Sequence, residues 1–248
     1  MPRRSILTKR QQARLFDLPT DAANLHEHYT LDDFDLEQIR DRRRAHNKMG
    51  FALQLCALRY PGRLLAPGEI IPSEVLEFLA DQIGIAAGDL AGYATREETR
   101  HNHLALLREI YGFKTFTGRG AAELRQWLLG QAFHAHSNLD LAERFIGRCR
   151  ETQTILPGIS TIVRLCAEML VKAERQIDAA IAAKLDPRMR LRLDVLLDDM
   201  VTDQLTRFVW LRQFEVGNNS RIANQLLDRL ERLQNLGLPA DILDGLPS

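Results

Sequence analysis

The sequence predicts an all-α protein, and two observations carry that prediction. Apolar residues recur at helical spacing along almost the whole chain, with short turns between the segments and no strand longer than a few residues. Of the 248 residues, 45% are hydrophobic but only 6% are aromatic, which favours helices packed through Leu, Ile and Ala over a β-sandwich. We expect two small helical modules, residues 1–90 and 91–185, followed by a helical linker region, residues 186–248.

Charge and cysteine content narrow the class of protein. The chain has 33 Lys and Arg against 33 Asp and Glu, so any attraction to a polyanion must come from local clusters of charge. Its three cysteines form no CxxC pair, which argues against a disulfide framework and a zinc site. No secretory signal opens the chain and no apolar run is long enough to cross a bilayer, so we expect a cytoplasmic protein without membrane contact.

Helix caps and breakers predict the elements of the first module. Thr8 can cap the first helix. Asp35 and Gln38 form a capping pair for a later helix, and Asn47 can cap the one after it. The expected elements, in order, are a helix over Lys9–Phe16, a short turn of helix or a loop at Leu25–Tyr29, a helix pair within Leu36–Arg63, and a helix over Glu74–Ile83 that Ser73 caps and Gly84 ends.

The stretch Leu36–Arg63 joins a basic run to an apolar helix. From Arg40 onward it holds seven basic residues and one acid. In the helix, Phe51, Leu55 and Leu58 stand at i, i+4 and i+7 and should form one buried stripe. A cationic rim with an apolar back suits docking on a polyanion, although a solvated charged face on a core helix would show the same pattern.

The second module contains a candidate helix-turn-helix. A helix over Leu139–Glu151 capped by Asn138, a turn with Leu156-Pro157-Gly158 and a long helix from about Ser160 follow one another. The second helix would present its N-terminal residues to DNA, although any corner between two helices has a similar sequence. The other elements expected in this module are a helix opened by a capping box at Thr95 and Glu98, a loop from Lys114 to Arg119, and a helix over Ala121–Ala135.

The linker region is predicted to consist of helices, with a turn at Gly217-Asn218-Asn219-Ser220 and a frayed end after Gly237. Asp186-Pro187 is a cap followed by proline at the first helical position. Its amphipathic part supports an alternative function, a helical interaction module that pairs with another protein or with itself. The expected apolar stripes are Val201, Leu205, Phe208 and Leu211 in one helix, and Ile222, Leu226, Leu230 and Leu233 in the next.

Motifs for catalysis are absent from the sequence. It has no phosphate-binding loop, no GxGxxG and no GxSxG elbow. His101 and His103 are two residues apart, as are His134 and His136, and on a helix such residues point to different faces, which disfavours a metal pair. Nothing resembles a two-metal carboxylate site, so a chain that works on nucleic acid here would bind it and not cut it.

Four segments, in this order, carry a family pattern: MPRRSIL, HYTLDDFDLEQIRDRRRAHNKMGFALQLCALRYPGRLL, TREETRHNHLALLREIYGFKTF and LPGISTIVRLCAEML. Together they resemble the N-terminal region of TnpA, the large transposase of replicative class II transposons. The second segment is similar to the family's I-x-x-RR run, N-x-x-G-[FY]-A-x-Q-L-C and R-[FY]-P-G. In the last segment Val163 stands where the family has an acidic residue, a mild departure.

This resemblance implies sequence-specific binding of double-stranded DNA at the terminal inverted repeats of a transposon. It also implies that catalysis belongs to an RNase H-like domain whose DDE carboxylates bind two Mg²⁺ ions, further along a chain several times longer. We therefore expect no enzyme activity and no cofactor in these residues. The resemblance places the protein on DNA in the bacterial cytoplasm, with self-association as a further expectation.

The candidate DNA-binding residues follow from the basic run, the helix starts and this resemblance. Phosphate contacts are expected from cationic side chains, and base readout from Arg, Asn, Ser and Thr near helix starts. An arginine in a helix pair has a competing structural role, because it can bridge to an acid such as Asp32, Asp33 or Asp41. The predicted phosphate contacts are Arg42, Arg43, Arg44, Lys48, Arg59, Arg63, Arg100, His103 and Lys114, and the predicted base contacts are Asn47, Arg96, Thr99, Ser160, Thr161 and Arg164.

Overall fold

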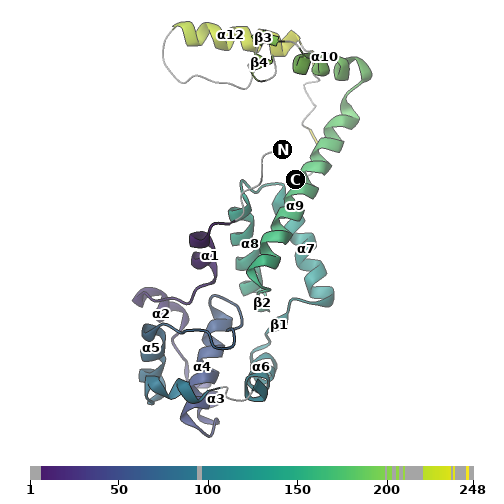
Figure 1. The fold of residues 1–248 in the computed structure, drawn as a ribbon. Helices are drawn as coiled ribbons and strands as arrows, with labels where there is room; N and C mark the ends of the chain where they lie inside the picture. The colour runs from purple at the N-terminus through teal and green to yellow at the C-terminus, as the bar shows by residue number, and fades with distance from the viewer. Residues whose placement is uncertain are drawn as a thin grey trace. The chain divides into compact units, whose positions relative to one another are not determined.

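The protein is essentially all-α in a computed structural model, as the sequence predicts (Figure 1). The structure describes residues 7–93, 97–198, 200–202, 205–206, 209, 220–235, 237 and 244–245. The chain forms two compact units, Met1–Val171 and Lys172–Ser248, whose boundary falls inside one long helix. The three-part division at residues 90 and 185 stays a prediction.

Short helices make up most of the first unit. Two strands of two residues each pair in parallel, with Lys114 opposite Thr154 and Thr115 opposite Ile155. The elements are α1 Lys9–Phe16, α2 Ala22–His28, α3 Asp33–Arg40, α4 Ala45–Arg59, α5 Ser73–Ile83, the 3-10 helix η1 Ala87–Gly92, α6 Glu97–Tyr111, β1 Lys114–Thr115, α7 Gly118–Ala132, α8 Asn138–Glu151, β2 Thr154–Ile155 and the start of α9 Ile159–Lys184.

Helix α4 lies at the centre of the first core. Every residue from Met49 to Leu58 is buried, so the helix packs on all sides and not only along the predicted stripe. Helices α3, α5, η1 and α6 all contact it. The same core includes Phe113 and Ile155, so residues far along the chain share it with the first helices.

Capping follows the predictions at some helices and not at others. The Thr8 hydroxyl accepts a hydrogen bond from the Gln11 backbone N–H, which confirms the start of α1. Helix α3 begins one turn earlier than predicted, because Asp32 is the cap and Asp35 is its capping-box partner. Asn47 does not cap α4, since its own N–H already bonds to the Arg44 carbonyl within the first turn.

The later boundaries differ by one to three residues. Pro72 and Ser137, not Ser73 and Asn138, are the residues before α5 and α8, and the Ser137 side chain accepts from Asp140 N–H. Gly84 ends α5 in a left-handed conformation, as predicted. The expected loop after Lys114 contains β1 and the start of α7. The predicted cap Thr95 lies outside the described residues.

The second unit differs more from its prediction. It contains α10 Pro187–Asp198, the antiparallel strands β3 Met200–Thr202 and β4 Leu205–Thr206, and α12 Ser220–Asn235. The predicted helical stripe through Val201 and Leu205 is therefore wrong, and the β-branched residues around it favour the strands that form. Phe208 and Leu211 lie outside the described residues. Asp186 caps α10 as predicted, through its carboxylate and the Met189 N–H.

Gly50 is required where α4 meets the ring of Tyr93. A Cβ atom at Gly50 would lie 2.2–2.3 Å from three ring atoms, far inside contact distance. Gly50→Ala should therefore destabilise the fold by about 1–3 kcal/mol, because the ring must move within a packed core. Gly130 in α7 has open space around its Cβ position, so Gly130→Ala should stabilise by about 0.5–1 kcal/mol. Urea denaturation of both variants measures the change in the free energy of unfolding. The same change in both variants would contradict the close packing at Gly50.

Among the described helices, none is both long enough and apolar enough to cross a membrane.

Candidate nucleic-acid interface

The turn between α3 and α4 carries a cluster of cations, which we call the cationic segment: Arg40, Arg43, Arg44 and Lys48. The three arginines are exposed and Lys48 is half-buried. Within the described part of the chain, none of these four side chains makes a hydrogen bond or ion pair. Their charges are therefore available to an external anion.

The start of α4 adds a second source of positive potential. Arg44 is the residue before the helix and makes no side-chain cap, and the first turn contains no acid. Helix α3, in contrast, has a capping box and acids in its first turn. The free N–H groups and the positive end of the α4 dipole thus lie beside Arg43 and Arg44, an arrangement that favours a phosphate.

The side chain of Arg42 packs against the protein, unlike those of the neighbouring Arg43 and Arg44. Its guanidinium lies over the ring of Phe51, with 5.0 Å from Cζ to the ring centroid. Its Nε atom is buried and has no hydrogen-bond partner among the residues that the structure describes. Arg42 therefore packs inward against the core, while Arg43 and Arg44 are exposed to solvent.

Arg59, a predicted phosphate contact, forms a two-pronged ion pair with buried Asp35. Both N···O distances are 2.7 Å, and the Tyr111 hydroxyl donates to the same carboxylate at 3.0 Å. Burial alone would raise the pKa of Asp35, but the hydrogen bonds and the charge of Arg59 outweigh it and hold that pKa below its usual value. The pair joins α3, α4 and α6, so it supports the fold.

Arg63 is also held inside the protein. Its guanidinium bonds to both oxygens of Glu69 at 2.5 and 2.9 Å, and its Nε donates to the Phe16 carbonyl at 2.7 Å. Arg59 and Arg63 therefore have the competing structural role that we expected for some of the arginines, because each bridges to an acid within the protein. The acids are Asp35 and Glu69, not the Asp32, Asp33 or Asp41 considered from sequence.

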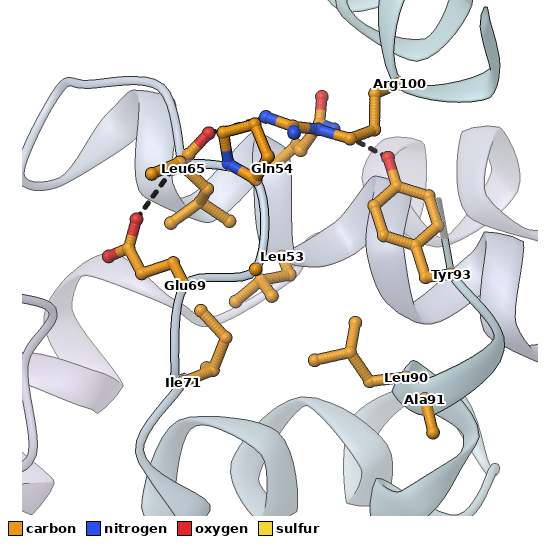
Figure 2. Close-up of a pocket in the computed structure, with 12 residues that line it drawn as sticks. Leu53, Gln54, Leu65, Glu69, Ile71, Leu90, Ala91, Tyr93 and Arg100 are labelled. Carbon is orange, nitrogen blue, oxygen red and sulfur yellow. Dashed lines mark hydrogen bonds between the residues drawn. The ribbon is translucent and has the colours of Figure 1, made fainter. Parts of the chain in front are cut away.

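Helix α6 turns two further predicted contacts toward the interior. His103 is 6% exposed, and its Nδ1 lies 3.1 Å from the Tyr93 hydroxyl. Burial, with the nearby charge of Arg42, lowers the pKa of His103 to about 4, so the ring is neutral at neutral pH. Arg100 donates to the Leu65 carbonyl at 2.6 Å and lines a cavity (Figure 2). Thr99 is half-buried on the same helix, and Arg96 lies outside the described residues.

The predicted reading helix, α9, begins with exposed polar side chains. Ser160 and Arg164 are exposed and Thr161 is half-buried. Lys114 is exposed on β1, and its backbone N–H donates to the Gln153 carbonyl. The connection from α8 to α9 runs over residues 152–158 and contains β2, whereas the turn of a helix-turn-helix has about 3–4 residues. The helix-turn-helix geometry itself stays a prediction.

A stack of three side chains links α2 and α8 to the residue that ends α4. The ring of Tyr60 lies between His28, at 4.2 Å between centroids, and the guanidinium of Arg150, at 4.4 Å. Arg150 Nε donates to the Pro61 carbonyl at 2.8 Å, and Leu156 N–H to the Gly62 carbonyl at 2.9 Å. These contacts tie α8 and the segment before α9 to the end of α4. Sequence reasoning missed Arg150, and no local pattern marks it.

In the described part of the chain, no three His, Cys, Asp or Glu side chains gather into a group that could hold a metal ion.

Comparison with known proteins gives a consistent set of relatives. A family model described as "Domain of unknown function (DUF4158)" matches residues 6–169. The chain is 38% identical over 242 residues to the transposase for transposon Tn21 of Escherichia coli, covering 98% of this chain and 24% of that transposase. It is 34% identical to the transposase for transposon Tn501 of Pseudomonas aeruginosa, covering 96% and 24%. The chain therefore spans about a quarter of the length of the curated relatives it matches, and the resemblance to transposases is confirmed.

Proposed function

This chain belongs to the DUF4158 family, and from that premise and its cationic segment we propose that it binds double-stranded DNA at the terminal inverted repeats of a transposon. The relatives are transposases, and a transposase must recognise the ends of its element. The chain covers about a quarter of the length of those relatives, so a role of the whole protein in transposition is likewise a proposal.

The observation that carries the proposal is the cationic segment, whose side chains have no partner among the described residues and which lies at the start of α4, where no side chain caps the helix. Arg43, Arg44 and the first N–H groups of α4 can hold a phosphate together. Such contacts fix the position of the protein on the duplex without reading its sequence. Because Arg59 and Arg63 are paired internally and His103 is buried, we leave these three out of the proposed contact surface.

Sequence readout is assigned to the start of α9. Arg164 and Ser160 are exposed there, no acid occupies the first turn, and an arginine can read guanine with two hydrogen bonds. The contacts at Tyr60, Pro61 and Gly62 join α8 and the segment before α9 to the end of α4, so the start of α9 and the cationic segment belong to the same compact unit. Asn47, half-buried in the first turn of α4, is the second candidate reader.

Arg164→Ala tests the readout. It should weaken binding to the terminal repeat by about 1–3 kcal/mol and weaken binding to a scrambled duplex much less, so that the specificity ratio falls. Arg175→Ala, at another exposed position of α9, is the matched control and should change neither affinity. Fluorescence anisotropy with both duplexes measures the ratio. Equal losses on the two duplexes would show that Arg164 contacts phosphate and does not read bases.

The strand-transfer chemistry of transposition is proposed to reside outside these 248 residues, with its Mg²⁺ ions. The greater length of the relatives, of which this chain covers about a quarter, supports this proposal. We place the protein's action on DNA in the bacterial cytoplasm.

A second candidate function is self-association through α12. Leu226, Leu227, Leu230 and Leu233 on this helix are 40–63% exposed, which is unusual for four apolar residues so close together. Pairing of α12 helices would cover them, and it is compatible with DNA binding by the first unit.

A further inference from the structure

A cavity of about 420 Å³ lies beside α4, with walls also from η1, the start of α6 and the segment that follows α4 (Figure 2). Leu53, Leu65, Ile71 and Leu90 make its walls largely apolar. A second cavity, of about 170 Å³, shares Arg100 and part of the same wall. The larger cavity has the size of a small-molecule site, and the DNA-binding proposal makes no use of it.

Arg100 is the cationic group of this cavity. It reaches the wall from α6, where one of its terminal nitrogens donates to the Leu65 carbonyl at 2.6 Å. Within the described chain this is the only hydrogen bond of its guanidinium. Its other N–H donors are therefore available to a ligand that enters the cavity.

The other charged residue of the lining is already neutralised. Glu69 accepts two hydrogen bonds from Arg63 and one, at 2.7 Å, from the Ala66 N–H. Burial alone would raise the pKa of Glu69, but these bonds lower it below its usual value, so the carboxylate stays charged and paired. Among the described residues of the lining, Arg100 is thus the charged side chain that makes no ion pair, although its charge also helps to lower the pKa of Glu69.

The polar part of the lining beside Arg100 is held in place by hydrogen bonds within the protein (Figure 2). Gln54 is 7% exposed, and its amide nitrogen donates to the Tyr93 hydroxyl at 2.6 Å. That hydroxyl in turn contacts His103, and the Tyr93 ring packs against Gly50. A cavity whose walls are fixed in this way loses little conformational entropy when a ligand binds.

We propose that this cavity is a binding site for a small monocarboxylate with an apolar tail. The carboxylate pairs with Arg100, and the tail lies among Leu53, Ile71 and Leu90. At about 30 Å³ for each water-sized group, the space accommodates roughly a dozen non-hydrogen atoms. A phosphate dianion fits less well, because its second charge would lie unpaired near Glu69. The site does not depend on the proposed DNA binding.

Decanoate, titrated into the whole chain by calorimetry, is the probe that tests the site. One molecule should bind per chain, and Arg100→Met should weaken binding about tenfold or more, as expected for loss of a charge-assisted hydrogen bond. Ala91→Trp, at an exposed position of the lining, should fill the cavity and abolish binding. Arg108→Met, on the exposed face of α6 outside both cavities, is the control and should bind like the wild type.

Two further ligands test the chemistry of the head group. Decanol has the same tail without a charge, and it should bind the wild type about as weakly as decanoate binds Arg100→Met. Decyl phosphate should bind more weakly than decanoate, and tighter binding would overturn the choice of a single charge. Uptake of decanoate that does not saturate, or affinities that are equal in the wild type, Arg100→Met and Ala91→Trp, would overturn the site itself.

Discussion

Replacement of Arg43 and Arg44 by glutamate is expected to weaken binding to the terminal repeat by about a hundredfold or more, with the fold intact. Both side chains are exposed and make no bond within the described chain, so the replacement removes no internal support. Together they are proposed to hold a phosphate beside the start of α4, and the reversed charges would also repel that phosphate. The slope of log K against log salt concentration should fall by about 0.9 for each phosphate that the variant no longer neutralises.

A matched double variant separates a local contact from general electrostatics. Lys9→Glu with Arg10→Glu makes the same change in net charge at two exposed positions of α1. If the cationic segment is the interface, this control should bind with nearly wild-type affinity. Equal weakening by both double variants would mean that only the total charge matters, and unchanged affinity after the Arg43 and Arg44 reversal would remove the segment from the interface.

Loss of the Arg59 side chain is expected to have the largest effect on stability. Arg59→Met should lower the free energy of unfolding by about 3–5 kcal/mol, because it leaves the carboxylate of Asp35 buried without its cation. The Asp35 side chain is only 1% exposed, and the remaining donor from another side chain is the Tyr111 hydroxyl. Urea denaturation of both proteins at neutral pH measures the difference.

The pH dependence of stability gives an independent check on this pair. The folded-state pKa of Asp35 is lowered, so its contribution to stability is present above its unfolded pKa and is lost as pH falls through the folded value. In Arg59→Met, burial without the cation should raise the pKa of Asp35, and protonation would then relieve the buried charge. The difference between the two proteins should therefore shrink from neutral pH to about pH 3. A constant difference would show that lost packing, not the ion pair, causes the effect.

Local chemistry makes parts of the fold predictable. The first helix follows its prediction from Lys9 to Phe16, because the Thr8 cap and the apolar spacing agree. The predicted start of α3 is one turn too late, since Asp32 and Asp35 can each serve as a cap and only their mutual bonds decide between them. The helix predicted through Val201 is a strand, because a short apolar run has no periodicity that separates a strand from a helix.

The candidate site is harder to predict, because partners distant in sequence decide which cations are free. Asp35 pairs with Arg59 across 24 positions, and Arg150 reaches Pro61 across 89. Such contacts depend on how the helices pack, which no local pattern contains. Exposed Arg43 and Arg44, in contrast, lie in a turn with one acid nearby, so a local pattern of charge is enough to select them.

Binding to terminal-repeat DNA is the central claim, and fluorescence anisotropy tests it most directly. One labelled duplex carries the terminal inverted repeat and the other a scrambled sequence, each at two salt concentrations. We expect tight binding to the repeat, much weaker binding to the scramble, and a steep loss of both as salt rises. Equal affinities would leave a phosphate-binding module without specificity. No binding to either duplex at low salt would contradict the account and favour a helical interaction module.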